Sequence, residues 1–129
     1  MKSQFATPVL LALAAFSLTT VARADDGGDP AAGQKIFNQC RTCHSTDAGK
    51  NLMGPSLHGI IGRKAGTADG YKVYSPAMQK VGFNWTVENL QKYLADPKGF
   101  VPGNRMVFSG VKKPEDRDNL IAYLKQATQ

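Results

Sequence analysis

A Cys-x-x-Cys-His run, Cys40-Arg41-Thr42-Cys43-His44, constrains this chain more than any other feature. The spacing is typical of the covalent attachment of a c-type haem. Two thiols this close in sequence can each form a thioether bond with one of the two vinyl groups of the porphyrin. The residue that follows then lies beneath the iron, so His44 can offer a ring nitrogen as a ligand. The run therefore predicts a haem protein whose redox centre is attached covalently through Cys40 and Cys43.

Three other interpretations of the same run are weaker. A structural zinc site needs four ligands, and the chain has no further Cys and only one further His, His58. A thioredoxin-like dithiol needs a βαβ context, and no alternation of strand and helix signals surrounds Cys40. A disulfide between Cys40 and Cys43 stays open at this point, so the rest of the chain decides between it and a haem.

The first 24 residues have the pattern of a cleaved export signal. Lys2 supplies a short positive region, an apolar run extends from Val9 to Leu18, and Ala22-Arg23-Ala24 has the small–x–small pattern of a cleavage site. The apolar run is shorter than the roughly 20 residues of a membrane-spanning helix. We expect residues 1–24 to be removed and residues 25–129 to form one domain. An uncleaved anchor or a buried helix is the alternative interpretation.

The charge balance of the exported chain indicates its class of partner. The full sequence has 16 Lys and Arg and 10 Asp and Glu. Loss of Lys2 and Arg23 with the signal leaves 14 basic residues against the same 10 acidic ones, a net charge of +4. A secreted protein rarely meets nucleic acid, so we interpret the excess as a docking face for acidic protein partners. We expect a monomer with no membrane span once the signal is removed.

The periodicity of the mature chain predicts helices and no strands, which makes the fold class all-α. A loop with many glycines runs from residue 45 to 70, and a second loop runs from Pro97 to Lys113. A loop as long as the first is unusual unless it is functional or wraps something. We expect about four helices, with these Gly- and Pro-rich loops, around one haem. The helices are predicted at residues 30–41, 75–80, 87–95 and 114–127.

The second axial position of the iron could be open or closed by another side chain. The candidates are Met53, Met78, Met106, His58 and the lysines. A methionine is more often a core filler than a ligand. Met106 differs by its context, because its loop joins two predicted helices and can pass across the haem face opposite His44. The context favours Met106 without excluding the others.

Further motifs follow one another along nearly the whole mature chain, from Gly33 to Thr128. In this order they resemble the motifs of class I c-type cytochromes, in particular bacterial cytochromes c2 and mitochondrial cytochromes c. The resemblance implies the small cytochrome c fold. Besides Cys40-x-x-Cys43-His44, the motifs are Gly33-x-x-Ile36-Phe37, Gly54-Pro55-x-Leu57-x-Gly59, Gly62-Arg63-x-x-Gly66, Trp85, Tyr93-Leu94-x-x-Pro97, Pro102-Gly103-x-x-Met106-x-Phe108-x-Gly110 and Leu120-Ile121-x-Tyr123-Leu124.

The resemblance also implies roles for nine residues around one covalent haem c. Cys40 and Cys43 would carry the thioethers, and His44 and Met106 would bind the iron. The Pro55 carbonyl would accept the other ring N–H of His44, which fixes the tautomer and raises the basicity of the ligand. The remaining four would neutralise or bond a buried haem propionate or lie near the Met106 sulfur: Arg63, Tyr74 and Trp85 for the propionate, and Tyr93 for the sulfur.

The chain departs from its relatives in three places. Many relatives have two tyrosines that flank one residue, whereas Tyr71 and Tyr74 flank two, so either could meet the propionate. Asn104 stands where relatives often have Thr, and it can also donate a hydrogen bond. Many mitochondrial forms have a histidine in the loop before Gly-Pro. Here that loop reads Gly49-Lys50-Asn51-Leu52, so we expect the loop staple to be missing.

The resemblance implies a soluble periplasmic carrier of single electrons between respiratory or photosynthetic redox partners, and not an enzyme. With both axial positions filled, the iron has no vacancy for a substrate. The alternative is a haem enzyme or gas sensor with an open distal site. Such a protein needs a distal acid–base group, and no histidine in the distal loop suggests one. The partner is expected to touch an exposed haem edge ringed by basic residues: Lys35, Lys50, Lys98, Arg105, Lys112 and Lys113.

Overall fold

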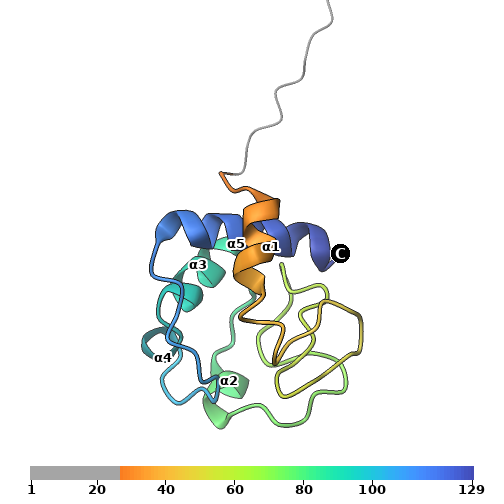
Figure 1. Cartoon of the computed structure of the whole chain (residues 1–129). Coiled ribbons are helices and arrows are strands. Elements are labelled where there is room, and N and C mark those ends of the chain that lie inside the picture. The colour runs from red at the N-terminus through yellow and green to blue at the C-terminus, as the bar shows by residue number, and fades with distance from the viewer. Residues whose placement is uncertain (1–26) are drawn as a thin grey trace, which may run out of the picture.

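Five helices and the loops between them make up residues 27–129, the part of the chain that the computed structural model describes (Figure 1). This range has no strand beyond one isolated bridge between Lys64 and Asn84, which confirms the all-α class. No helix in it is long and apolar enough to cross a membrane. The predicted export signal, residues 1–24, lies outside the described residues. The helices are α1 (Pro30–Phe37), α2 (Pro76–Lys80), α3 (Val87–Ala95), α4 (Pro97–Phe100) and α5 (Pro114–Ala127).

Local sequence signals fix where the helices begin. Every helix except α3 has proline in its first turn, where the fixed φ suits the helix and the missing N–H leaves no donor unpaired. Side-chain oxygens cap α1 to α4 by accepting a hydrogen bond from a backbone N–H of the first turn. The capping residues are Asp29, Ser75, Thr86 and Asp96.

The first helix is shorter than predicted. It ends at Phe37 rather than near Arg41. Hydrogen-bonded turns then carry the chain onward, with the Cys40 N–H 2.8 Å from the Phe37 oxygen and the His44 N–H 3.0 Å from the Cys40 oxygen. These turns tighten the backbone, and Cys40, Cys43 and His44 all line one cavity.

The loop predicted from Pro97 to Lys113 contains a helix of its own, α4. Asp96 explains it, because its carboxylate accepts from the Gly99 N–H while Pro97 occupies the first turn. The described chain therefore has one helix more than the four expected. The rest of the loop returns to α5 without regular structure.

Helices α1 and α5 cross closely at one end of the molecule (Figure 1). A Cβ on Gly33 would overlap the Asn119 carbonyl and lie 2.8 Å from the Tyr123 Cβ, so only glycine permits this approach. The Phe37 and Tyr123 rings pack beside the crossing with centroids 5.1 Å apart. Leu120 is 1% exposed there. From this crossing the end of α1 leads directly into the Cys-x-x-Cys-His segment.

The histidine staple of the loop before Gly54 is missing, as expected, but another side chain takes its place. Asn51 bridges two parts of the long loop: its amide donates to the Asp69 carbonyl at 2.8 Å, and its oxygen accepts from the Ser56 N–H at 2.9 Å. The buried Ser56 hydroxyl adds a bond to the Asp47 carbonyl. Asn51 thus joins these two segments in the absence of a histidine.

Candidate functional site

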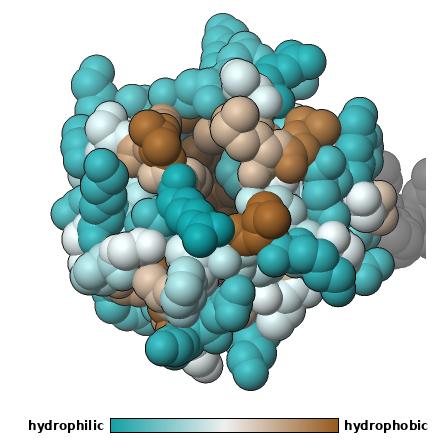
Figure 2. Space-filling view, turned by 90° about the horizontal axis from the view of Figure 1, so that it is seen from below, coloured by the Kyte–Doolittle hydropathy of each residue, from teal (hydrophilic) through white to brown (hydrophobic). Residues whose placement is uncertain are grey.

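A cavity of about 440 Å³ lies between the helices and the long loops. Figure 2 shows its opening on the face opposite the α1–α5 crossing. Its inner wall is largely apolar and includes Leu90, Leu94, Leu120 and Leu124. All nine residues that the sequence predicted for the site line this one cavity: Cys40, Cys43, His44, Pro55, Arg63, Tyr74, Trp85, Tyr93 and Met106.

The His44 imidazole is oriented by its backbone neighbours. Its Nδ1 lies 2.7 Å from the Pro55 carbonyl oxygen, which can only accept, so Nδ1 carries the proton and Nε2 keeps a lone pair. Burial lowers the pKa of His44, which favours the neutral ring that a metal requires. A Cβ on Gly54 would overlap this ring. Gly54 therefore belongs to the site, although the sequence motif alone gave it no role.

The Met106 sulfur has a partner that identifies it among the methionines. The Tyr93 hydroxyl lies 3.7 Å from the sulfur and is placed to donate to it. Burial raises the pKa of Tyr93 to about 12, so the hydroxyl keeps its proton at neutral pH. Met78 is buried in α2, and Met53 is 80% exposed at the mouth of the cavity. Neither of their sulfurs accepts from a hydroxyl in the described structure, although the Met53 sulfur lies 3.8 Å from the Cys43 thiol.

Asn104 fixes the loop that carries Met106. Its amide donates to the carbonyls of Pro97 and Val101 at 2.8 and 2.9 Å. Its oxygen accepts from the Met106 N–H at 2.9 Å. In Figure 1 the loop between α4 and α5 lies on the left, and the segment that follows α1 lies to its right. The loop is thus held directly at the residue that the sequence favours as a ligand.

Arg63 offers a buried donor that nothing in the described chain accepts. Its Nη1 donates to the His58 carbonyl at 2.7 Å and its Nη2 to the Ser56 carbonyl at 2.9 Å. Its Nε is buried without a partner among residues 27–129, and an unmet buried donor costs roughly 1–3 kcal/mol. A half-buried cation whose buried Nε has no acceptor, at the wall of a cavity, fits the carboxylate of a haem propionate.

Tyr71 and Tyr74, the two candidates for the propionate, differ in the use of their protons. The Tyr71 hydroxyl donates to the Met53 carbonyl at 2.8 Å. The Tyr74 oxygen accepts from the Ala68 N–H at 2.9 Å, so its own proton is free to donate elsewhere. The geometry therefore favours Tyr74 over Tyr71 as the donor to a propionate. Trp85 is 6% exposed and lies edge-on to the Phe83 ring, with ring centroids 5.0 Å apart.

The disulfide and zinc interpretations of the Cys-x-x-Cys-His run find no support in the described structure. Cys40 and Cys43 form no disulfide with each other, and burial raises the pKa of the Cys40 thiol to about 11. Within residues 27–129, no three His, Cys, Asp or Glu side chains gather as a metal site. An apolar cavity with a neutral imidazole, a thioether and two thiols on its wall fits a covalently attached haem.

The comparisons with known proteins agree with this geometry. The sequence model of the family described as cytochrome c matches residues 30–128. Cytochrome c2 iso-2 of Magnetospirillum fulvum is 56% identical over 89 residues, which cover 69% of this chain and 92% of that protein. Cytochrome c of Ginkgo biloba is 48% identical over 103 residues, 78% of this chain and 90% of that one. The solved structure of cytochrome cH from Methylobacterium extorquens aligns with a TM-score of 0.72 at 49% identity and covers 77% of this chain and 99% of that chain.

Proposed function

The chain belongs to the cytochrome c family, with haem c attached through Cys40 and Cys43, and we propose that it is a periplasmic carrier of single electrons. In this proposal His44 and Met106 bind the iron. The haem, when bound, supplies one-electron exchange between ferric and ferrous iron. The observation that supports the proposal best is that Met106, whose sulfur lies 3.7 Å from the Tyr93 hydroxyl, lines the same cavity as His44.

The protein's own residues set the properties of the carrier. The bond from His44 to the Pro55 carbonyl makes the imidazole a better donor to the metal. A thioether ligand and an apolar wall both disfavour the extra positive charge of the ferric state, so we expect a high reduction potential. Arg63 and Tyr74 are placed to hold the negative end of the haem. The close packing of the wall keeps these groups in place during electron transfer.

An enzyme or gas sensor needs an open iron position and an acid–base group beside it. No Asp or Glu lines the cavity in the described part of the chain, and the one histidine there is His44. The tyrosine nearest the expected ligand, Tyr93, points its hydroxyl at the Met106 sulfur. No observation therefore favours this alternative.

A spectroelectrochemical titration of the exported holoprotein tests the proposal. We expect a single one-electron step, the ferric absorption band of methionine–iron ligation, and no uptake of carbon monoxide by the reduced protein at neutral pH. A filled position explains the last result, because carbon monoxide must displace Met106. A high-spin ferric spectrum with ready binding of cyanide and carbon monoxide would instead support the enzyme or sensor.

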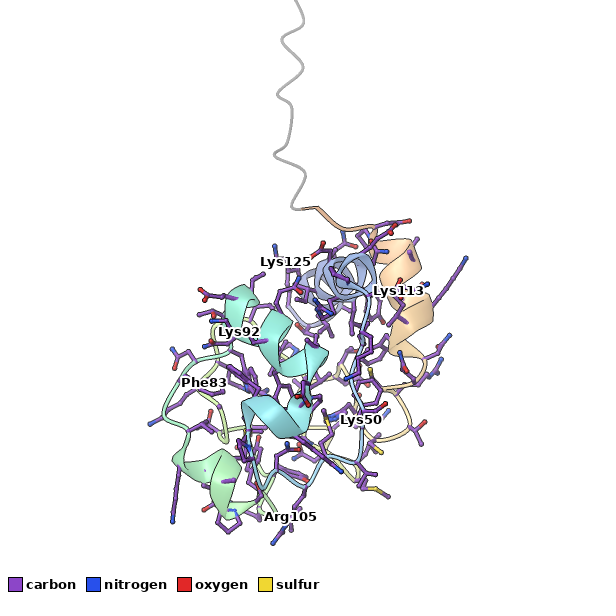
Figure 3. All side chains as sticks on the ribbon, turned by 90° about the vertical axis from the view of Figure 1, so that its left-hand side faces the viewer. Lys50, Phe83, Lys92, Arg105, Lys113 and Lys125 are labelled. Atoms are coloured by element: carbon purple, nitrogen blue, oxygen red, sulfur yellow. The ribbon has the colours of Figure 1, made fainter. Side chains whose placement is uncertain are left out.

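The docking face in this proposal surrounds the mouth of the cavity. Figure 3 places Arg105 at the end of the molecule where the cavity opens, and places Lys113 toward the opposite end. Arg105 lines the mouth and donates to the Val73 carbonyl at 3.3 Å. All six cations predicted for the face are exposed, but Arg105 is the one that borders the opening. We therefore assign it the largest share of the attraction for an acidic partner.

Small redox probes of opposite charge measure this attraction without a known partner. Oxidation by ferricyanide, an anion, is expected to slow as salt is added, and oxidation by a cationic cobalt complex to quicken. Arg105→Gln should lower the low-salt ferricyanide rate more than Lys92→Gln does. Lys92 is a matched control, since it lies on α3 away from the mouth and pairs with Glu88. Rates that stay flat with ionic strength, or equal effects of both variants, would contradict the proposed face.

A further inference from the structure

The loop that carries Met106 has a second anchor that the sequence did not indicate. After Met106 the chain runs back to the start of α5 (Figure 1). On the way, the Val111 N–H donates to the Leu94 carbonyl at 2.7 Å, and the Lys112 ammonium donates to the Ala95 carbonyl at 3.0 Å. The returning limb of the loop is thus laid against the end of α3.

One guanidinium closes this anchor. Arg117 of α5 donates from Nη1 to the carbonyls of Val111 and Lys112, at 2.8 and 2.9 Å, and from Nε to the Gln91 side chain of α3 at 3.1 Å. Gln91 in turn donates to the Asp118 carboxylate at 2.6 Å. Arg117 is half-buried, and charged donors in such places form the stronger class of hydrogen bond. It therefore joins α5, α3 and the loop.

Arg117 also connects the loop to the other side of the site. It lies two residues before Asn119, whose carbonyl lies against Gly33 at the α1–α5 crossing. Helix α1 leads directly from that crossing to the segment that carries His44. Helix α5 thus contacts both the helix that leads to His44, through Asn119, and the returning limb of the Met106 loop, through Arg117.

We propose that Arg117 is a positioning residue that holds the Met106 sulfur in place by clamping the returning limb of its loop to α3 and α5. The proposal rests on the proposed role of Met106 as a ligand. Asn104 fixes the limb before Met106, and Arg117 fixes the limb after it. Loss of the clamp lets the loop open more often, so the sulfur leaves the iron more often, while the α1–α5 crossing stays intact.

Imidazole binding to the ferric holoprotein tests the clamp. At saturating imidazole the binding rate reports how often Met106 leaves the iron. Arg117→Lys keeps the charge but lacks the separate Nε–H and the planar fork that reach Gln91 and the two carbonyls together, and we expect it to raise this rate about tenfold. Arg117→Ala should raise it further, so that lysine rescues part of the effect. Lys113→Gln is the matched control, because it removes a neighbouring positive charge and none of these bonds, and it should leave the rate unchanged.

Two further measurements separate the clamp from general stability and from the ligand assignment. Exchange of the Val111 amide hydrogen should quicken in Arg117→Lys by the same factor as imidazole binding, whatever ligand the iron has. The equilibrium constant for unfolding in denaturant should change by a smaller factor than either rate. Unchanged imidazole binding and Val111 exchange in Arg117→Lys would overturn the clamp. Absence of the methionine–iron band from the unaltered protein would instead overturn the proposed function.

Discussion

Replacement of Met106 by leucine is expected to abolish the ferric methionine–iron band and to lower the reduction potential. Leucine fills a similar volume but has no lone pair to offer the iron. The preference of a thioether ligand for ferrous iron is therefore lost, and the reduction potential falls. Axial ligands set haem potentials over about 0.8 V, and we expect a fall on the order of 100 mV. The emptied position should also make the reduced protein bind carbon monoxide. Absorption spectra and voltammetry of the holoprotein measure all three effects.

Two other methionines of the chain serve as matched controls. Met53 is 80% exposed and Met78 is 8% exposed, and both line the same cavity. Met53→Leu and Met78→Leu make the same chemical change without removing the sulfur that Tyr93 contacts. We expect both to keep the ferric band and nearly the same potential. An optical and voltammetric signature that survives Met106→Leu but not Met78→Leu would move the ligand to α2.

Sequence signals that act locally predicted the helices well. Asp29-Pro30 and Ser75-Pro76 each combine a capping oxygen with a proline, and α1 and α2 begin at those prolines. The end of α1 was predicted too late, since its apolar periodicity continues to Cys40 while the backbone tightens into turns after Phe37. The short α4 was missed because four residues show no periodicity. The start of a helix therefore follows from capping side chains near it in the sequence. Its end depends on the turns that follow, which the periodicity does not show.

The site was predictable to the extent that its motifs are short and ordered. All nine predicted residues line one cavity, and all but Tyr74 stand in one of the ordered motifs. Asn51 and Arg117 were missed because their partners, Asp69 and Val111, are neither periodic nor part of a motif. Gly54 stood in a motif, but its contact with the His44 ring needs the folded structure. Residues that touch the cofactor were thus easier to predict than residues that hold those in place.

A chain that cannot attach haem is expected not to fold cooperatively. The haem would cover the apolar wall of this cavity, and each 100 Å² of such a wall left to water costs about 2.5 kcal/mol at about 25 cal/mol per Å². The whole stability of a domain of this size is about 5–15 kcal/mol. Arg63 would add an unmet buried donor to that cost. The sum leaves little or no net stability for the haem-free chain.

The double variant Cys40→Ser/Cys43→Ser provides this haem-free chain. Its far-ultraviolet circular dichroism should show reduced helix content, and its thermal melt should be broad rather than sigmoidal. Thr42→Ser changes the same run while leaving both thiols, so it should bind haem and melt like the unaltered protein. A native-like spectrum with a cooperative melt from the double variant would mean that the helices pack without the cofactor. In that case the α1–α5 crossing at Gly33, rather than the haem, would be the main source of stability.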